Sequence, residues 1–170
     1  MKISRLLFLV CLAVSIAAGL RLWVFEAIYV ASGSMEPTLP VGLHLVVDKV
    51  TLRLRAPRRG DIVIFHSPVG EDIDLCKRVV ALPGETVELR AKKVFIDGRE
   101  LSEPYAVHKR EGEQLVGDDL EPVQVPAGAL FLLGDNRDES QDATVWRDAS
   151  GQPIRFIAAK DLKGVVRGVY

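Results

Sequence analysis

The sequence lacks the features on which most metal-, cofactor- and nucleic-acid-binding proteins depend. Its 170 residues include only two cysteines and three histidines, which stand apart from one another without C-x-x-C spacing or a His/Cys cluster. No metal site and no other cofactor is therefore expected. The 22 basic and 23 acidic residues nearly cancel, to a formal net charge of -1. Because no field of one sign results, the composition offers no argument for nucleic acid as a partner.

Scarce cysteine also argues against a disulfide-stapled fold. Cys11 lies inside an apolar N-terminal run, whereas Cys76 lies in a strand-like segment far downstream. A structural disulfide between two such different settings is not expected. Internal repeats and low-complexity segments are absent too. The chain therefore fits one compact domain with a short hydrophobic extension.

The chain begins with its longest hydrophobic run. Lys2 and Arg5 precede Leu6–Leu20, and these 15 residues would extend about 22 Å as a helix. The hydrocarbon core of a bilayer is about 30 Å thick. A membrane-spanning helix would therefore have to continue through Leu22–Phe25, with Arg21 reaching towards the headgroups.

A cleaved secretory signal is the alternative interpretation of this segment. A basic start and an apolar stretch with small residues at 17–19 fit that description as well. We favour a retained anchor over residues 1–30, with one transmembrane helix and with Trp23 at a membrane interface. Residues 31–170 would then form the domain that the anchor carries. Both interpretations put that domain outside the cytoplasm, because the basic residues favour keeping the N-terminus inside.

The remainder of the chain is predicted to be mainly β. After Val30 no sustained 3.6-residue periodicity is present, and short β-branched runs alternate with Gly, Pro and Asp. The pair Asp97-Gly98 favours a type I′ turn, which would join a strand at 94–96 to the next strand. The polar stretch 108–121 is expected to be a long exposed loop. Further strands are expected over residues 43–47, 61–65, 75–81, 85–89, 130–133 and 164–169.

Three separate segments carry residues that could do chemistry. In Ser32–Leu39, a serine is flanked by glycine and followed by proline, which suits an exposed turn with free backbone N–H groups. In Leu75–Gly84, Lys77 stands among residues that favour burial, and burial would lower its pKa from about 10.4 into a range useful for a base. Gly134–Asp142 is dense in polar groups. Taken singly, the first segment is typical of a juncture loop, the second of a strand with a solvent-facing lysine, and the third of a solvated loop.

Together, these segments resemble the sequence boxes of the type I signal peptidase family. Ser32–Leu39 matches S-G-S-M-x-P-T-L, Gly60–Val63 matches G-D-I-V, Lys77–Gly84 matches K-R-V-V-A-x-P-G, and Gly134–Asp142 matches G-D-N-R-x-x-S-x-D. The order of the boxes and the upstream hydrophobic segment agree as well. The resemblance covers nearly all of the chain beyond the anchor. It implies a mainly β, antiparallel-sheet, signal-peptidase-like catalytic domain.

The resemblance also implies a serine-lysine dyad. Ser34 would attack the scissile carbonyl, while neutral Lys77 would accept and later return the proton. The backbone N–H of Ser34 and the hydroxyl of Ser32 would form the oxyanion hole. Ser140 would orient the amine of Lys77. The family's supporting ion pairs are expected at three further residues: Arg78, Asp135 and Asp142.

The implied protein is a membrane-bound serine endopeptidase, signal peptidase I. It would remove N-terminal signal peptides from exported preproteins by cleaving after small residues, with the substrate bound as an added strand. Its partners would be preprotein substrates and the lipid bilayer, without nucleic acid. It would be a single-pass protein of the inner (plasma) membrane, with the catalytic domain on the extracytoplasmic side. General secretory, pilin- or conjugation-specific and mitochondrial members of the family all fit the sequence.

Two other classes of protein share part of the pattern. A self-cleaving, repressor-type peptidase uses the same dyad, but it would be cytoplasmic and would carry a DNA-binding module. The N-terminal hydrophobic segment argues against it. A catalytically inactive, membrane-tethered peptide-binding module would need neither Ser34 nor Lys77, so the presence of both favours an enzyme.

The sequence departs from the family pattern after Asp142. The family commonly has Ser-Arg next, whereas residues 143–144 are Ala-Thr here. Burying an unpaired carboxylate is costly, so an inward-facing Asp142 is expected to recruit a nearby arginine. Arg147 is the favoured partner because the chain can curl back over so few residues. Arg155 and Arg137 are the alternatives.

Cys76 is a second departure, since an apolar or aromatic residue is more usual before the lysine. Successive side chains of a strand point to opposite faces. Cys76 is therefore expected to point away from the face of Lys77 and to act as a packing residue.

Overall fold

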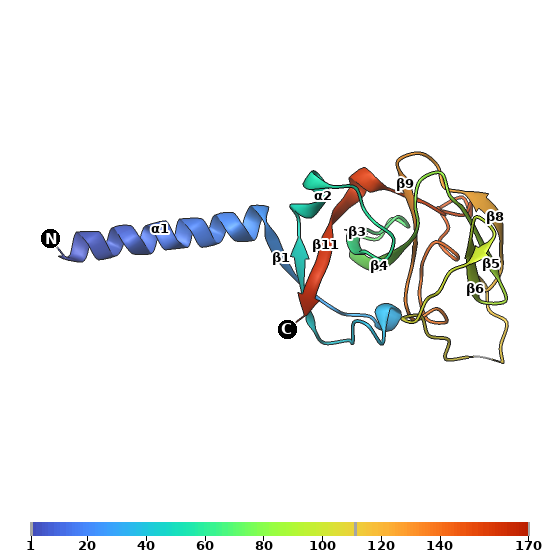
Figure 1. The fold of residues 1–170 in the computed structure, drawn as a ribbon. Coiled ribbons are helices and arrows are strands. Elements are labelled where there is room, and N and C mark those ends of the chain that lie inside the picture. Colours follow the sequence, from blue (N-terminus) through green and yellow to red (C-terminus); the bar gives the residue numbers. More distant parts are fainter. Residues whose placement is uncertain (1, 111, 170) are drawn as a thin grey trace.

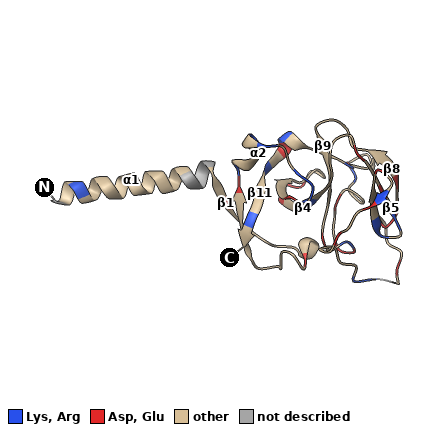
Figure 2. Ribbon diagram, in the orientation of Figure 1, with Lys and Arg blue, Asp and Glu red and all other residues tan. Residues whose placement is uncertain are grey.

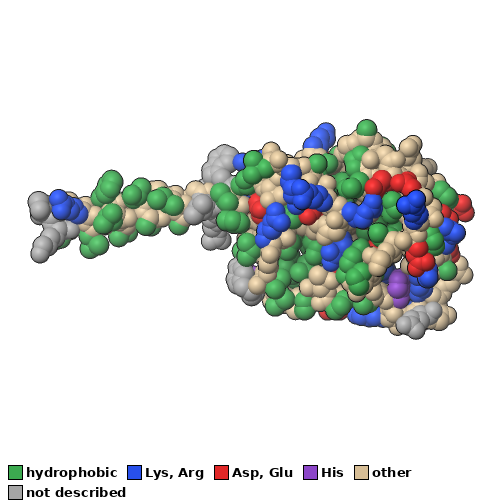
Figure 3. Space-filling view, in the orientation of Figure 1, with side chains coloured by type: hydrophobic (Ala, Val, Ile, Leu, Met, Phe, Trp, Pro, Cys, Tyr) green, Lys and Arg blue, Asp and Glu red, His purple; other side chains and the backbone are tan. Residues whose placement is uncertain are grey.

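A long helix and a β domain make up the chain. The computed structural model describes residues 2–110 and 112–169, apart from the side chains of residues 2 and 20–23. Helix α1 (Lys2–Trp23) extends away from the β domain (Figure 1). Its described side chains are exposed and mostly hydrophobic, and the charged residues gather on the β domain (Figure 2; Figure 3). Counting described residues alone, neither α1 nor the short α2 (Thr51–Leu54) has the length and hydropathy that a membrane span requires. The positions expected for the side chains of Arg21 and Trp23 lie outside the described part.

Seven strands form the larger of two sheets. Their order is β1-β2-β11-β3-β4-β9-β10, and every neighbouring pair is antiparallel. The mainly β, antiparallel fold predicted from the sequence is thus confirmed. The strands are β1 (Phe25–Tyr29), β2 (His44–Asp48), β3 (Ile62–His66), β4 (Asp74–Ala81), β9 (Ala129–Leu133), β10 (Ile157–Ala158) and β11 (Leu162–Val169). Two 3-10 helices flank them, η1 (Gly33–Met35) and η2 (Ala159–Asp161).

A smaller sheet has the order β7-β6-β5-β8. Its strands are β5 (Thr86–Arg90), β6 (Lys93–Ile96), β7 (Arg99–Glu100) and β8 (Leu120–Gln124). Asp97 and Gly98 join β6 to β7, with φ angles of 50° and 78°. A type I′ turn needs positive φ at both central residues, so the predicted hairpin is confirmed.

Three strands, β1, β8 and β10, were not predicted from the sequence. Residues 25–29 were assigned to the anchor, but they form β1 and pair with β2 along their whole length, so the β domain begins before residue 30. The apolar pattern runs from α1 into β1 without a break, which hides the boundary. Strand β8 begins inside the predicted 108–121 loop, and its proline at 122 obscures the strand pattern. Strand β10 has only two residues.

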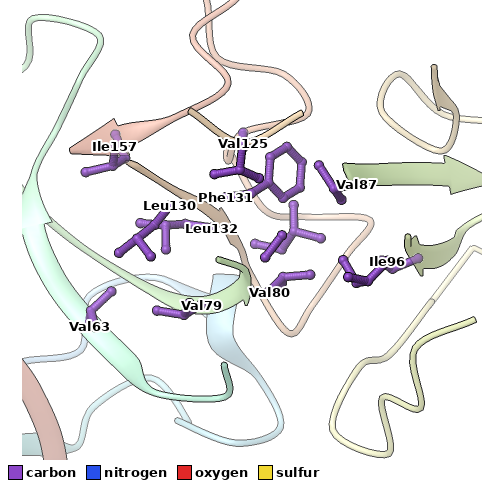
Figure 4. Packing of buried hydrophobic residues seen from close by; sticks show 14 of the residues in the cluster. Val63, Val79, Val80, Val87, Ile96, Val125, Leu130, Phe131, Leu132 and Ile157 are labelled. Carbon is purple, nitrogen blue, oxygen red and sulfur yellow. The ribbon is translucent and has the colours of Figure 1, made fainter. Parts of the chain in front are cut away.

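Buried side chains form two clusters. The larger joins both sheets and includes Val63, Val79 and Leu132 from one and Val87 from the other (Figure 4). The smaller cluster contains Met35 of η1, which is 1% exposed and packs with residues of β2 and β3. Burying such a side chain stabilises by about 1.5–3 kcal/mol. Burial of Met35 therefore holds η1, and with it the segment of the predicted nucleophile, against the larger sheet.

Candidate active site

A groove of about 530 Å³ brings the three candidate segments together. One part of its wall comes from the end of β1, the loop that contains Ser32, and η1 with Ser34. Another part comes from β4, including Lys77, and the third segment contributes Glu139 and Gln141. Residues more than a hundred positions apart in the sequence therefore face one cleft.

Ser34 lies in η1, next to the buried Met35 that anchors this turn. The hydroxyl of Ser32 donates a hydrogen bond to the Ser34 Oγ over 3.3 Å. Ser32 itself precedes η1 in an extended conformation, which brings its side chain back over the turn. The two hydroxyls assigned to the nucleophile and the oxyanion hole are therefore neighbours at the groove.

Lys77 lies on β4, opposite Val63 of β3, and is 2% exposed. Helix η1 packs against the same strand. Among the described residues, no carboxylate lies within ion-pair distance of the Lys77 amine. Burial lowers the pKa of this amine, and the charges of Asp142, Cys76 and Asp135 oppose that shift without outweighing it. Burial therefore makes the neutral, proton-accepting form of Lys77 more accessible than that of a solvated lysine, in the same groove that Ser34 lines.

Gly134 allows the third segment to approach the first. A Cβ atom at this position would lie 2.2 Å from the Ser140 Oγ and 2.5 Å from the Ser34 carbonyl oxygen. No side chain larger than hydrogen fits there. The Ser140 hydroxyl is buried and has no hydrogen-bond partner among the described residues. Ser34 and Ser140 are thus brought within a few ångströms of one glycine.

Arg78 and Asp135 form a buried ion pair. The guanidinium donates from Nε to Oδ1 over 2.8 Å and from Nη2 to Oδ2 over 2.5 Å. Thr38 donates to the same carboxylate over 2.5 Å, and the Arg78 guanidinium stacks 4.0 Å from the ring centre of Tyr105. This bidentate pair joins β4 to the loop after β9 and to the chain that follows η1.

Asp142 is buried, but no arginine of the described residues forms an ion pair with it. Its Oδ2 accepts the backbone N–H of Gly134 over 3.0 Å. Its Oδ1 accepts the N–H and the hydroxyl of Thr144 over 3.1 and 2.8 Å. Three hydrogen bonds therefore satisfy the carboxylate locally. The expected pairing of Asp142 with Arg147 is wrong.

Two of the three candidate arginines have other partners, and the third is exposed to solvent. Arg137 pairs with Glu103 over 2.6 Å, and Arg155 donates to the carbonyls of residues 143 and 144. Arg147 is exposed. Thr144, which stands where the family pattern has arginine, supplies two donors of its own, so the carboxylate does not need a cation.

Cys76 packs in the smaller apolar cluster and also contributes to the wall of the groove. Burial raises the pKa of its thiol to about 12. The expected packing role is therefore confirmed, although this face of the strand also reaches the groove.

A polar network that includes Glu139 of the groove wall was not predicted from the sequence. Lys109 donates to Glu36 over 3.2 Å and to Glu139 over 3.1 Å. Glu139 also accepts the side-chain amide of Asn136 over 2.8 Å. The only sequence signal for a role of Asn136 was its position inside the motif Gly134–Asp142. Lys109 lies in the predicted exposed loop and had none.

Comparison with known proteins agrees with this geometry. The family model for signal peptidase, peptidase S26, matches residues 3–170. The chain belongs to this signal peptidase family. A probable signal peptidase I-1 of Synechocystis sp. is 41% identical over 145 residues, which cover 81% of this chain and 71% of the relative. Signal peptidase I of Bacillus licheniformis is 37% identical over 138 residues, which cover 79% and 74%. A crystal structure of a signal peptidase I from Enterococcus faecalis matches with a TM-score of 0.52 and 33% identity, over 66% of this chain and 98% of that one.

The chain is thus a serine peptidase that removes signal peptides from preproteins. Family and activity were both predicted from the four motifs, and both are confirmed. The result decides against the repressor-type peptidase and the inactive binding module. Three of the four motifs, those with Ser34, Lys77 and Glu139, contribute residues to one groove.

Proposed function

We propose that Ser34 is the nucleophile and Lys77 the general base of this signal peptidase. The observation that supports the assignment best is the buried Lys77 amine, with its lowered pKa, in the same groove as Ser34. A serine hydroxyl is a weak nucleophile until a base removes its proton. An amine that burial holds neutral can serve as that base without a histidine.

The reaction then proceeds in two steps. Neutral Lys77 takes the proton of the Ser34 hydroxyl as the oxygen attacks the scissile carbonyl carbon. The backbone N–H of Ser34 and the hydroxyl of Ser32 stabilise the oxyanion, at about 3 kcal/mol for each good donor. The Lys77 ammonium returns the proton to the leaving amine, which frees the mature protein. Water, activated by Lys77, then hydrolyses the acyl-enzyme ester and releases the signal peptide.

The supporting residues fix the positions of these groups. We propose that the buried Ser140 hydroxyl, which has no partner among the described residues, orients the Lys77 amine. The charge of Asp142 acts on the Lys77 amine, and three local hydrogen bonds hold that carboxylate in place. The pair of Arg78 and Asp135 ties β4, which carries Lys77, to the loop after β9.

The groove suits a small, extended peptide segment. Strand β1 is an edge strand of the larger sheet, and the chain from β1 to Ser32 lines the groove. A substrate added alongside would be held by main-chain hydrogen bonds. The apolar walls include Leu45, Ile64 and Cys76, and they leave room for small residues before the scissile bond.

We propose that helix α1 is a single-pass anchor in the inner (plasma) membrane. Its described residues do not meet the requirement for a span by themselves, but the sequence adds Leu20, Leu22 and Trp23 before the helix ends. From residue 3 to residue 18 its side chains are exposed, and almost all of them are apolar. Only Val24 separates the helix from β1. The groove would therefore stay close to the outer face of the bilayer, where the cleavage site of an exported preprotein emerges.

The assignment is tested with the full chain in detergent and a preprotein whose mature N-terminus is then sequenced. Cleavage should follow a small residue. Ser34→Ala and Lys77→Ala should each remove nearly all cleavage, whereas Ser102→Ala, at an exposed serine outside the groove, should leave it unchanged. Normal cleavage by Ser34→Ala or Lys77→Ala would disprove the dyad. The anchor is tested by alkaline extraction of membranes, after which the full chain should remain in the pellet.

A further inference from the structure

Asn136, the chain's single asparagine, holds the backbone on both sides of the proposed nucleophile. It is fully buried, at 0% exposure. Its side-chain Nδ2 donates to the Gly33 carbonyl over 3.0 Å, and its backbone N–H donates to the Ser34 carbonyl over 3.1 Å. Two consecutive carbonyl groups of the nucleophile turn are therefore bound by one residue.

The bond to Gly33 determines where the next N–H points. The Gly33–Ser34 peptide bond is trans, and in a planar trans peptide the C=O and N–H groups point in opposite directions. The Gly33 carbonyl also accepts the N–H of Glu36 over 3.1 Å. With this carbonyl directed at buried Asn136, the Ser34 N–H has to face the other way. It donates to no acceptor among the described residues, although Ser34 lines the groove.

We infer that Asn136 is a positioning residue for the oxyanion hole. By holding the Gly33 carbonyl, it keeps the Ser34 N–H directed at the site where negative charge develops. This inference rests on the proposed function of Ser34. A hydrogen bond to the carbonyl also polarises the peptide group, and a polarised N–H is a stronger donor. Oxyanion donors act best when their direction is set before the reaction.

A second set of contacts fixes the amide of Asn136 in this orientation. Nδ2 also donates to Glu139 Oε2, which accepts Lys109 as well, and Lys109 reaches Glu36 at the far end of the nucleophile turn. Both partners of the amide are oxygen acceptors, so the nitrogen has to face them. The Asn136 Oδ1 is buried without a partner among the described residues. The side chain is therefore used as a double donor.

The test compares Asn136→Asp and Asn136→Ala with wild type, using the full chain in detergent and a signal-peptide substrate. Replacing the amide donors should lower kcat by about 10- to 100-fold while KM changes by less than about 3-fold. A peptide aldehyde adds the serine oxygen and forms a hemiacetal, whose oxygen occupies the oxyanion position. Its affinity should fall by the same factor as kcat, whereas the affinity for the cleaved product peptide should not change. Asn136→Ala adds no buried charge, so it remains informative if Asn136→Asp folds poorly.

Glu103→Gln is the matched control. It breaks the ion pair with Arg137, the residue that follows Asn136, and does not touch Gly33 or Ser34. It should lower thermal stability and leave the ratio of aldehyde to product affinity unchanged. The pH at which activity rises should be the same in wild type and both Asn136 variants, since Lys77 stays buried. Equal losses of aldehyde and product affinity, a shifted pH limb, or a kcat near that of wild type would overturn the inference. Full cleavage by Ser34→Ala would instead overturn the proposed dyad.

Discussion

Strand β4 carries two neighbouring cations, Lys77 and Arg78, that the fold treats in opposite ways. Their side chains leave the strand on opposite faces. On one face, burial lowers the pKa of Arg78, but the hydrogen bonds and the charge of Asp135 outweigh it and raise the pKa overall. On the other face, Lys77 is buried more deeply, at 2% exposure against 9% for Arg78, and its pKa is lowered. One strand thus holds a structural cation beside an amine whose pKa burial lowers.

The difference between the two faces shows why the order of these residues matters. A guanidinium stays charged at any physiological pH, so it needs a buried anion, and its planar fork matches a carboxylate. A lysine amine can lose its proton instead of recruiting a partner. If the two side chains were exchanged, the arginine would place a permanent charge in the groove of the proposed nucleophile. The lysine would offer Asp135 a single ammonium group in place of the planar fork. Four predictions test this comparison.

The largest effect is expected on activity. Lys77→Arg keeps the charge and Lys77→Met removes the amine, so each should lower the cleavage rate by about 10³- to 10⁴-fold. In wild type the rate should rise with pH as Lys77 deprotonates, along a limb below the usual lysine pKa of 10.5. Initial rates measured from pH 5 to 11 check both points. Substantial activity of Lys77→Arg would show that a neutral amine is not required.

The next effect concerns stability on the opposite face. Arg78→Met leaves the buried Asp135 carboxylate without its cation and should lower the free energy of unfolding by about 3–5 kcal/mol. Urea denaturation followed by tryptophan fluorescence measures the change. The double variant Arg78→Met/Asp135→Leu should recover part of the loss, because no unpaired charge remains. A loss below about 1 kcal/mol in the single variant would contradict the structural role of the pair.

Lys77→Met should raise the free energy of unfolding by about 1 kcal/mol, whereas Arg78→Met should lower it. The pKa of Lys77 is lower in the folded state than in the unfolded state, so the unfolded chain binds more protons between the two values. Wild-type stability therefore rises with pH in that window, and the advantage of Lys77→Met shrinks as pH approaches 10.5. Thermal melts at several pH values test this. An advantage that grows with pH would contradict the burial of a neutral amine.

The smallest effect concerns Asp142, whose charge acts on Lys77. A double-mutant cycle of Asp142→Asn with Thr144→Val should give a coupling energy of about 1 kcal/mol, because the two side chains share a hydrogen bond. The matched cycle with Arg147→Gln should be additive within about 0.5 kcal/mol. Coupling to Arg147 in place of Thr144 would show that Asp142 is paired with a cation after all.

The sequence by itself determined the class of fold and supplied the main residues of the proposed site. Short β-branched runs and the Asp97-Gly98 turn predicted most strands of both sheets, because side-chain alternation and turn chemistry are local properties. Ser34 and Lys77 followed from motifs with fixed spacing. The hydrophobic N-terminal helix was also evident, but its end was not, since β1 continues the same apolar pattern.

Tertiary structure alone decided which groups are neighbours and how deeply they are buried. Asp142 takes its donors from Gly134 and Thr144, and no sequence pattern distinguishes that arrangement from pairing with an arginine. Asn136 contacts Gly33 across 103 positions of sequence. The lowered pKa of Lys77 comes from burial, which exists only after the strands around β4 have assembled. Hydrogen bonding and desolvation depend on distances in space, so the chemistry of this site is set by the fold.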